Sequence, residues 1–316
     1  MTTSPTPPPT TPPPAAPSGP PTMPMKRLSW VEPLGIVLLT VMAALLGMDA
    51  VLYWSDARGW VFRLVPVVGA LGCVAHAHYL LGRRTSLAFF SAAVVVGWVA
   101  EELGVTTGLV FGPYHYTDVL GHKLGAVPLL IPLIWFMILY LAYVISNLIA
   151  GDGPAGHYKH ISHAVWLSAL GALIATAYDL TLDPFMSQEP IRAWRWDASG
   201  PYYDIPDQNF RGWIAVAFVA LLLMRLIHRR TGNRPLGVAT NRYVAGLPIV
   251  CYAVLWLSNS NSLLPSLRMV SLIAMGIPTV AAGAVWWRHF HLMDDHVKVP
   301  GAPVAGGGVA GPGGAR

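Results

Sequence analysis

Charged side chains are scarce in this chain. Asp, Glu, Lys and Arg make up 11% of its 316 residues, whereas hydrophobic residues make up 54%. A soluble domain carries about 25% charged residues, so the composition excludes an ordinary soluble protein and indicates an integral membrane protein. The formal net charge is only +5, and no basic stripe is interleaved with aromatic residues, so we expect no nucleic-acid partner.

Residues for redox and cofactor chemistry are also few. Cys73 and Cys251 both lie in apolar runs, where small core side chains are expected rather than a disulfide framework or a metal site. No lysine lies in the middle of an apolar run, which excludes a retinal Schiff base. The histidines do not form the HxxxH and HxxHH patterns of membrane di-iron hydroxylases. We therefore expect neither a metal nor another cofactor.

Long apolar runs make up most of the chain. Eight of them are each close to the ~20 residues that a helix needs to cross a bilayer, which predicts an all-α, polytopic membrane helical bundle. Pro128 and Pro132 predict an irregular start of the fourth helix. Asp183, which precedes Pro184, is expected to end the fifth. The predicted spans are 33–54, 60–81, 86–109, 127–149, 161–182, 211–228, 243–261 and 266–287.

The two ends of the chain differ from its centre. Residues 1–28 are rich in Pro and Thr, and residues 291–316 are rich in Gly, so both are expected to be disordered tails. The start is not expected to be a signal peptide, because no apolar stretch precedes its first basic residues. Residues 29–290 are expected to form one transmembrane catalytic domain, with residues 183–210 as an ordered cap.

Basic residues are concentrated in alternate loops, which predicts how the helices are oriented. Lys26 and Arg27, Arg83 and Arg84, and a group of arginines between residues 229 and 242 all fall on one side of the predicted bundle. The positive-inside rule makes that side cytoplasmic, together with both termini. The loop after residue 109 and the 183–210 cap then share the opposite face.

Two pairs of acidic residues interrupt the apolar runs. Glu101 is expected roughly 12 Å below the membrane surface, and Glu102 points about 100° away from it, so the sequence leaves open which one faces a pocket. Asp179 and Asp183 are four residues apart and share one helical face. Acids in hydrocarbon are functional-site candidates by default. Deprived of water, such a group is expected to be protonated, as a general acid requires; pairing with an arginine or capping a helix is the alternative.

Aromatic and polar residues near these acids are candidates for binding a substrate. Tyr114 and Tyr116 lie in the loop after the third run, and Trp135 lies about two turns into the fourth, facing either lipid or a pocket. An inward-facing indole could stabilise a nearby cation. Trp196 lies in the expected cap, and Asn209 precedes the sixth run. Each of the five also has a structural alternative.

Four motifs occur in order along the chain. They are E-x-x-G-V-x-T-G-x-x-F-G-x-Y-x-Y (101–116), V-P-x-x-I-P-x-x-W (127–135), D-L-x-L-D-P (179–184) and W-x-W…G-x-Y-Y-x-I-P…N-F-x-G-W (194–213). In this combination the chain resembles, over roughly residues 30 to 290, the carotenoid-biosynthesis membrane proteins that include the CruF-type carotenoid 1,2-hydratases and the bisanhydrobacterioruberin hydratases. Asp204 departs from the pattern, which has a glycine there.

The resemblance implies a cofactor-free hydratase, a hydro-lyase of the cell membrane. It would add water across the terminal isoprenoid double bond of a lycopene- or γ-carotene-like substrate, giving a tertiary alcohol through a tertiary carbocation. As a hypothesis, Glu101 donates the proton, Asp179 and Asp183 place water, and Trp135 forms an aromatic wall with the two tyrosines. Membrane lipid and other carotenoid-pathway enzymes are the expected partners. The alternatives are a proton-coupled transporter and a non-catalytic carotenoid-binding protein.

Overall fold

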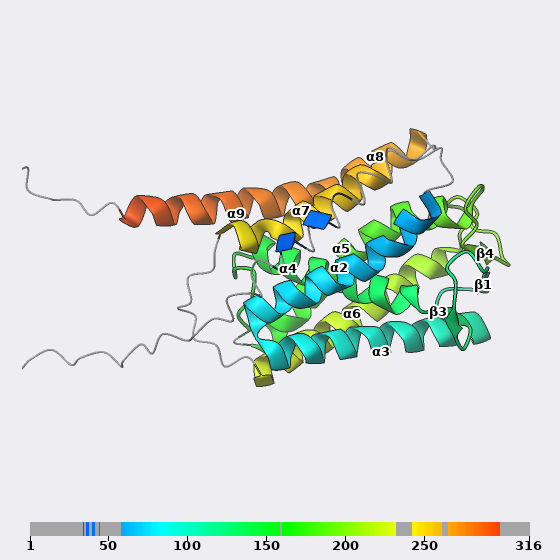
Figure 1. Cartoon of the computed structure of the whole chain (residues 1–316), viewed down its shortest axis with the longest axis horizontal. Coiled ribbons are helices and arrows are strands. Elements are labelled where there is room, and N and C mark those ends of the chain that lie inside the picture. The colour runs from blue at the N-terminus through cyan, green and yellow to red at the C-terminus, as the bar shows by residue number, and fades with distance from the viewer. Residues whose placement is uncertain are drawn as a thin grey trace, which may run out of the picture.

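The protein is a bundle of long helices with a small β-structured cap at one end (Figure 1). Apart from a few positions between residues 34 and 44, the computed structural model describes residues 58–158, 160–231, 242–260 and 265–297. Most of the predicted span 33–54, all of the predicted tail 1–28 and residues 298–316 of the other tail lie outside the described residues. Residues 291–297, which were expected to belong to that disordered tail, are instead the last turns of a helix. The helices are α2 (Arg58–Leu81), α3 (Arg83–Thr107), α4 (Leu130–Ile149), α5 (Ile161–Ser187), α6 (Asp207–Thr231), α7 (Arg242–Ser260), α8 (Pro265–Ala274) and α9 (Gly276–Val297).

Seven of the predicted spans are confirmed as helical segments that are long and apolar enough to cross a membrane. The seventh of these runs from Ser266 to Arg288 and therefore combines most of α8 with the first part of α9. The join between the two helices lies next to Pro278, which has no N–H to donate to the carbonyl of Ala274. The predicted all-α membrane bundle is thus correct for the described residues.

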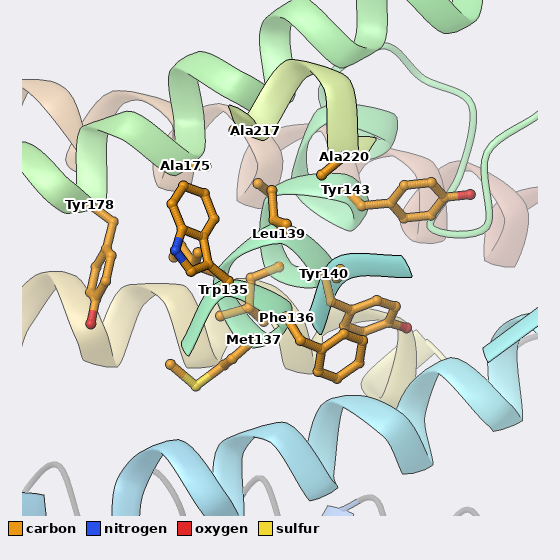
Figure 2. Close-up of a cluster of buried hydrophobic side chains, with 14 of the residues drawn as sticks. Trp135, Phe136, Met137, Leu139, Tyr140, Tyr143, Ala175, Tyr178, Ala217 and Ala220 are labelled. Carbon is orange, nitrogen blue, oxygen red and sulfur yellow. The ribbon is translucent and has the colours of Figure 1, made fainter. Parts of the chain in front are cut away.

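Helix α4 is the centre of the bundle. In its apolar span 83% of the residues are buried inside the protein, compared with 28% in the last span. A helix that is apolar on every side is expected at such a position. The side chains of α4 point in all directions and meet neighbouring helices, as Trp135, Phe136, Met137 and Tyr143 do in Figure 2.

Of the two predictions made from prolines, one is correct and the other is wrong. Helix α4 begins at Leu130, after Pro128 has ended strand β3, and Pro132 lies in its first turn, as the two prolines predict. Helix α5 was expected to end at Asp183 but continues through Pro184 to Ser187. Proline frees the carbonyl four residues before it, and here the hydroxyl of Tyr202 donates to Leu180 O at 2.7 Å. The cap therefore replaces the missing hydrogen bond, and the helix extends by one turn.

The cap joins two segments that are far apart in sequence. Strand β1 (Tyr114–Tyr116) pairs antiparallel with β4 (Trp194–Trp196), and β2 (Lys123–Leu124) pairs with β3 (Val127–Pro128). In Figure 1 these strands lie together at one end of the bundle. Asp204, where the family pattern has glycine, has a φ of 60°, a left-handed conformation that glycine adopts without strain.

Candidate active site

Glu101 is buried at the capped end of α3, where it faces the protein interior. Its Oε2 accepts hydrogen bonds from the hydroxyl groups of Tyr114 and Tyr116, the latter at 2.7 Å. Its Oε1 accepts the indole N–H of Trp135 at 2.8 Å. The neighbouring Glu102 points elsewhere and accepts the backbone N–H of Ala126 at 2.9 Å, which holds the β2–β3 hairpin. Of the two glutamates, Glu101 is thus the one whose carboxyl group is bound by aromatic side chains.

Asp179 and Asp183 are two further buried carboxyl groups, and the side-chain amide of Asn209 links them. The Nδ2 of Asn209 donates to Asp179 Oδ2 and to Asp183 Oδ2, each at 2.8 Å. Both aspartates are buried on the same face of α5, as their spacing predicts. Asp183 Oδ1 also accepts the indole N–H groups of Trp194 at 2.7 Å and Trp196 at 3.1 Å.

The two groups of acids belong to one continuous cluster, because the β1–β4 pairing places Tyr114 opposite Trp196. Their ring centroids are 5.1 Å apart, and these two side chains hydrogen-bond to Glu101 and Asp183 respectively. All eight residues expected from the sequence to form the site therefore contribute to this cluster, which we call the acid cluster: Glu101, Tyr114, Tyr116, Trp135, Asp179, Asp183, Trp196 and Asn209.

In the part of the chain that the structure describes, the acid cluster contains hydrogen-bond donors but no paired cation. Among the described residues, no Lys, Arg or His forms an ion pair with Glu101, Asp179 or Asp183. Burial, followed by the Glu101 carboxyl group, raises the pKa of both Tyr114 and Tyr116 well above its ordinary value. The two phenols therefore keep their protons and remain donors to Glu101 at any physiological pH.

Two aromatic residues that were not expected to line the site complete its wall. Trp135 is 1% exposed, which settles that it faces inward. Its ring stacks on Trp213, with centroids 4.0 Å apart and an interplanar angle of 22°, and on Phe111 at 6.3 Å. Trp213 is buried as well, at 7% exposed. Trp213 and Phe111 both lie within the family motifs of the sequence, and from these motifs the two residues could have been identified as part of the site.

Two glycines allow the helices to approach closely enough to form this wall. A Cβ at Gly97 would lie 2.8 Å from the Cβ of Trp135, and one at Gly212 would collide with the backbone oxygen of Val110. Real Cβ atoms do not approach other atoms this closely, so any larger residue would push α3 away from α4, or α6 away from the turn after α3.

An apolar groove lies on another part of the bundle. It has a volume of about 310 Å³. None of the acid-cluster residues lines it. The groove is formed by Ile149, Leu170, Leu173, Ile174, Ile273, Ala274, Ile277, Pro278 and Ala281. Within the described ranges, no group of three or more His, Cys, Asp or Glu side chains is arranged to hold a metal ion.

Comparison with known proteins identifies relatives. Residues 60–282 match the model of a family described as carotenoid biosynthesis protein. The chain is similar to a bisanhydrobacterioruberin hydratase of Haloarcula japonica, with 32% identity over 156 residues, which is 49% of this chain and 50% of the relative. The chain thus matches about half the length of this curated relative. No solved structure matches.

Proposed function

Because the chain belongs to this family of carotenoid biosynthesis proteins, we propose that it is a carotenoid hydratase. It adds water across the terminal isoprenoid double bond of an acyclic or monocyclic carotene, resembling lycopene or γ-carotene, to give a tertiary alcohol. The observation that carries this proposal is the acid cluster, in which three buried carboxyl groups and several aromatic rings gather at one end of an apolar bundle. The hydratase in Haloarcula japonica supports the reaction class.

The reaction needs an acid, a base and a wall that tolerates positive charge. Protonation of the alkene at its less substituted carbon forms a new C–H bond and leaves a tertiary carbocation. Water then attacks that cation and loses a proton to the base. The stacked rings of Trp135 and Trp213 offer a quadrupole that stabilises a cation near an aromatic face, and they replace bulk water, which would otherwise compete with a positioned molecule.

The hydrogen bonds around Glu101 support its role as the base. It accepts three donors, from Tyr114, Tyr116 and Trp135. Donors aimed at a carboxyl group stabilise its ionised form. We therefore assign Glu101 to removing a proton from the attacking water, which departs from the expectation from sequence that Glu101 is the proton donor.

The aspartate pair is better suited to hold the transferred proton. Two carboxyl groups that hydrogen-bond to the same nitrogen repel each other when both are ionised, so in a water-poor site they share one proton. Asp183 accepts two indole N–H groups in addition to Asn209, and these donors favour its ionised form. We therefore place the proton on Asp179. Each turnover leaves the proton of Asp179 on the product and places one proton from water on Glu101. Before the next cycle Glu101 must therefore release its proton and the aspartate pair must take one up.

Pigment analysis in a carotene-producing host tests the proposal. Expression of the wild-type chain should produce a hydroxylated carotene whose oxygen comes from isotopically labelled water rather than from O₂. The Asp179→Asn variant should lose about 10²- to 10⁴-fold in rate, the range for removal of a general acid. The exposed Asp118 on the cap supplies a matched control, since Asp118→Asn should retain full hydration. Absence of any new pigment with the wild-type chain would favour a binding or transport role instead.

Infrared spectroscopy separates the two assignments. A protonated carboxyl group has a C=O stretch distinct from that of a carboxylate. The wild-type protein should show such a band, which Asp179→Asn removes and Glu101→Gln retains. If Glu101→Gln removed the band and Asp179→Asn did not, Glu101 would be the proton donor and the assignment of the acid to Asp179 and the base to Glu101 would be wrong.

A further inference from the structure

A second buried polar group lies at the opposite end of the bundle. Arg225 is on α6, sixteen residues beyond Asn209 and therefore about 24 Å from it along the helix. It is 0% exposed. The ring of Tyr143 on α4 lies against it, and Figure 2 shows that this ring is well separated from Trp135 on the same helix. A guanidinium cannot lose its proton in a protein, so this part of the bundle holds a permanent buried positive charge.

Only some of the N–H groups of the guanidinium have a hydrogen-bond partner in the described part of the protein. Nη2 donates to Ser146 Oγ at 2.7 Å and lies 3.3 Å from Asn147 Oδ1. The rings of Tyr143 and Tyr158 lie 4.8 and 5.6 Å from its central carbon. Nε and Nη1 are buried and have no hydrogen-bond partner among the residues that the structure describes. Together these two nitrogens carry three N–H bonds, and buried donors without a partner are rare because each is costly.

No carboxylate in the described part of the chain is paired with Arg225. The nearby Asp152, in the loop after α4, is paired with His163 instead, with Nε2 and Oδ2 3.1 Å apart. This contact is too poorly aligned to be a hydrogen bond. Burial raises the pKa of Asp152, and the nearby His163, His157 and Arg225 only partly offset this rise. His228 is hydrogen-bonded to Tyr143. Asp152 is therefore engaged with a histidine and not directly with the guanidinium.

The surrounding surface is also basic. Thr85 at the start of α3 is hydrogen-bonded to Thr231 at the end of α6, 2.8 Å apart, so these two ends meet. Each end carries two exposed arginines, Arg83 and Arg84 on α3, and Arg229 and Arg230 on α6. Arginines at a helix end interact with lipid phosphates at the membrane boundary.

We infer that Arg225 forms a binding site for a phosphate oxyanion at this end of the bundle. Several acceptor oxygens on one tetrahedral group match N–H donors that point in different directions. A phosphate also supplies an anion in direct contact with the guanidinium, which none of the described carboxylates does. The rings of Tyr143 and Tyr158 cover the guanidinium, and Tyr158 belongs to the loop after α4. The phosphate comes from a phospholipid headgroup or from free phosphate, and the chemistry is the same for both. This site is independent of the proposed hydratase reaction.

Thermal unfolding of the purified, delipidated protein in detergent tests the site. Phospholipid should raise the Tm relative to a glycolipid with the same acyl chains, by roughly 5–10 °C near saturation. A parallel titration compares inorganic phosphate with chloride at equal ionic strength. A shift in the phospholipid arm alone identifies a headgroup, and shifts in both arms identify any accessible phosphate. Native mass spectrometry should detect one retained phospholipid if the headgroup is the ligand.

Variants then locate the effect. Arg225→Gln should abolish the shift, whereas Arg211→Gln, an exposed arginine near the other end of the same helix, should retain it. If Arg225→Gln does not fold, Arg225→Lys keeps the charge but not the guanidinium geometry and should reduce the shift. The inference is overturned if the wild-type protein shows no shift in either arm, which would mean that water satisfies the free N–H groups. An equal shift in the wild-type and Arg225-substituted proteins would also overturn it.

Discussion

The three hydrogen bonds to Glu101 make a quantitative prediction for a double-mutant cycle. In Glu101→Gln the amide oxygen can accept from the two tyrosines, which leaves the amide NH₂ facing the indole N–H of Trp135, 2.8 Å from the present Oε1. A buried donor without an acceptor costs about 1–3 kcal/mol, and this variant should be destabilised by that amount. Trp135→Phe removes the same bond from the other side and also reduces the stacking on Trp213.

The two substitutions should not add. Both break one hydrogen bond, so the double variant should be more stable than the sum of the single variants predicts, by about 1–3 kcal/mol. The free energy of unfolding is measured by denaturant or thermal unfolding in detergent for all four proteins. A second cycle pairs Glu101→Gln with Tyr143→Phe. Tyr143 is eight residues beyond Trp135 and therefore about 12 Å further along α4, so the two free-energy changes should be additive within about 0.5 kcal/mol. Additivity in the first cycle would refute the view that Trp135 and Glu101 form one energetic unit.

Three further predictions concern the frame of the acid cluster, each measured as a change in unfolding free energy. Tyr202→Phe should cost about 1 kcal/mol, because Leu180 O loses the donor that replaces the proline-broken bond. Gly125→Ala should cost about 1–3 kcal/mol, because φ is +66° and the new Cβ would lie 2.6 Å from Glu102 Oε2; a neutral effect would show that the hairpin adapts. Gly97→Ala should also cost about 1–3 kcal/mol and lower hydration, because the buried indole on α4 must shift.

The sequence alone was sufficient for the elements that depend on local composition. Apolar runs of bilayer length predict the helices, because a backbone in hydrocarbon must satisfy its own hydrogen bonds. The spacing of Asp179 and Asp183 predicts a shared face, since residues four apart meet on a helix. The same reasoning predicted which residues gather at one end, because the loops that carry them alternate with the basic ones.

Side-chain direction and long-range pairing were decided only by the tertiary structure. Glu101 and Glu102 are indistinguishable by composition, and only the packing of α3 against α4 turns the first towards Trp135 and leaves the second at the hairpin. The continuation of α5 past Pro184 depends on a hydroxyl eighteen residues further along the chain than that proline. The burial of Arg225 likewise results from contacts of α6 with α4 and with Tyr158 in the loop after α4. Each outcome depends on contacts between segments distant in sequence, for which a local pattern carries no signal.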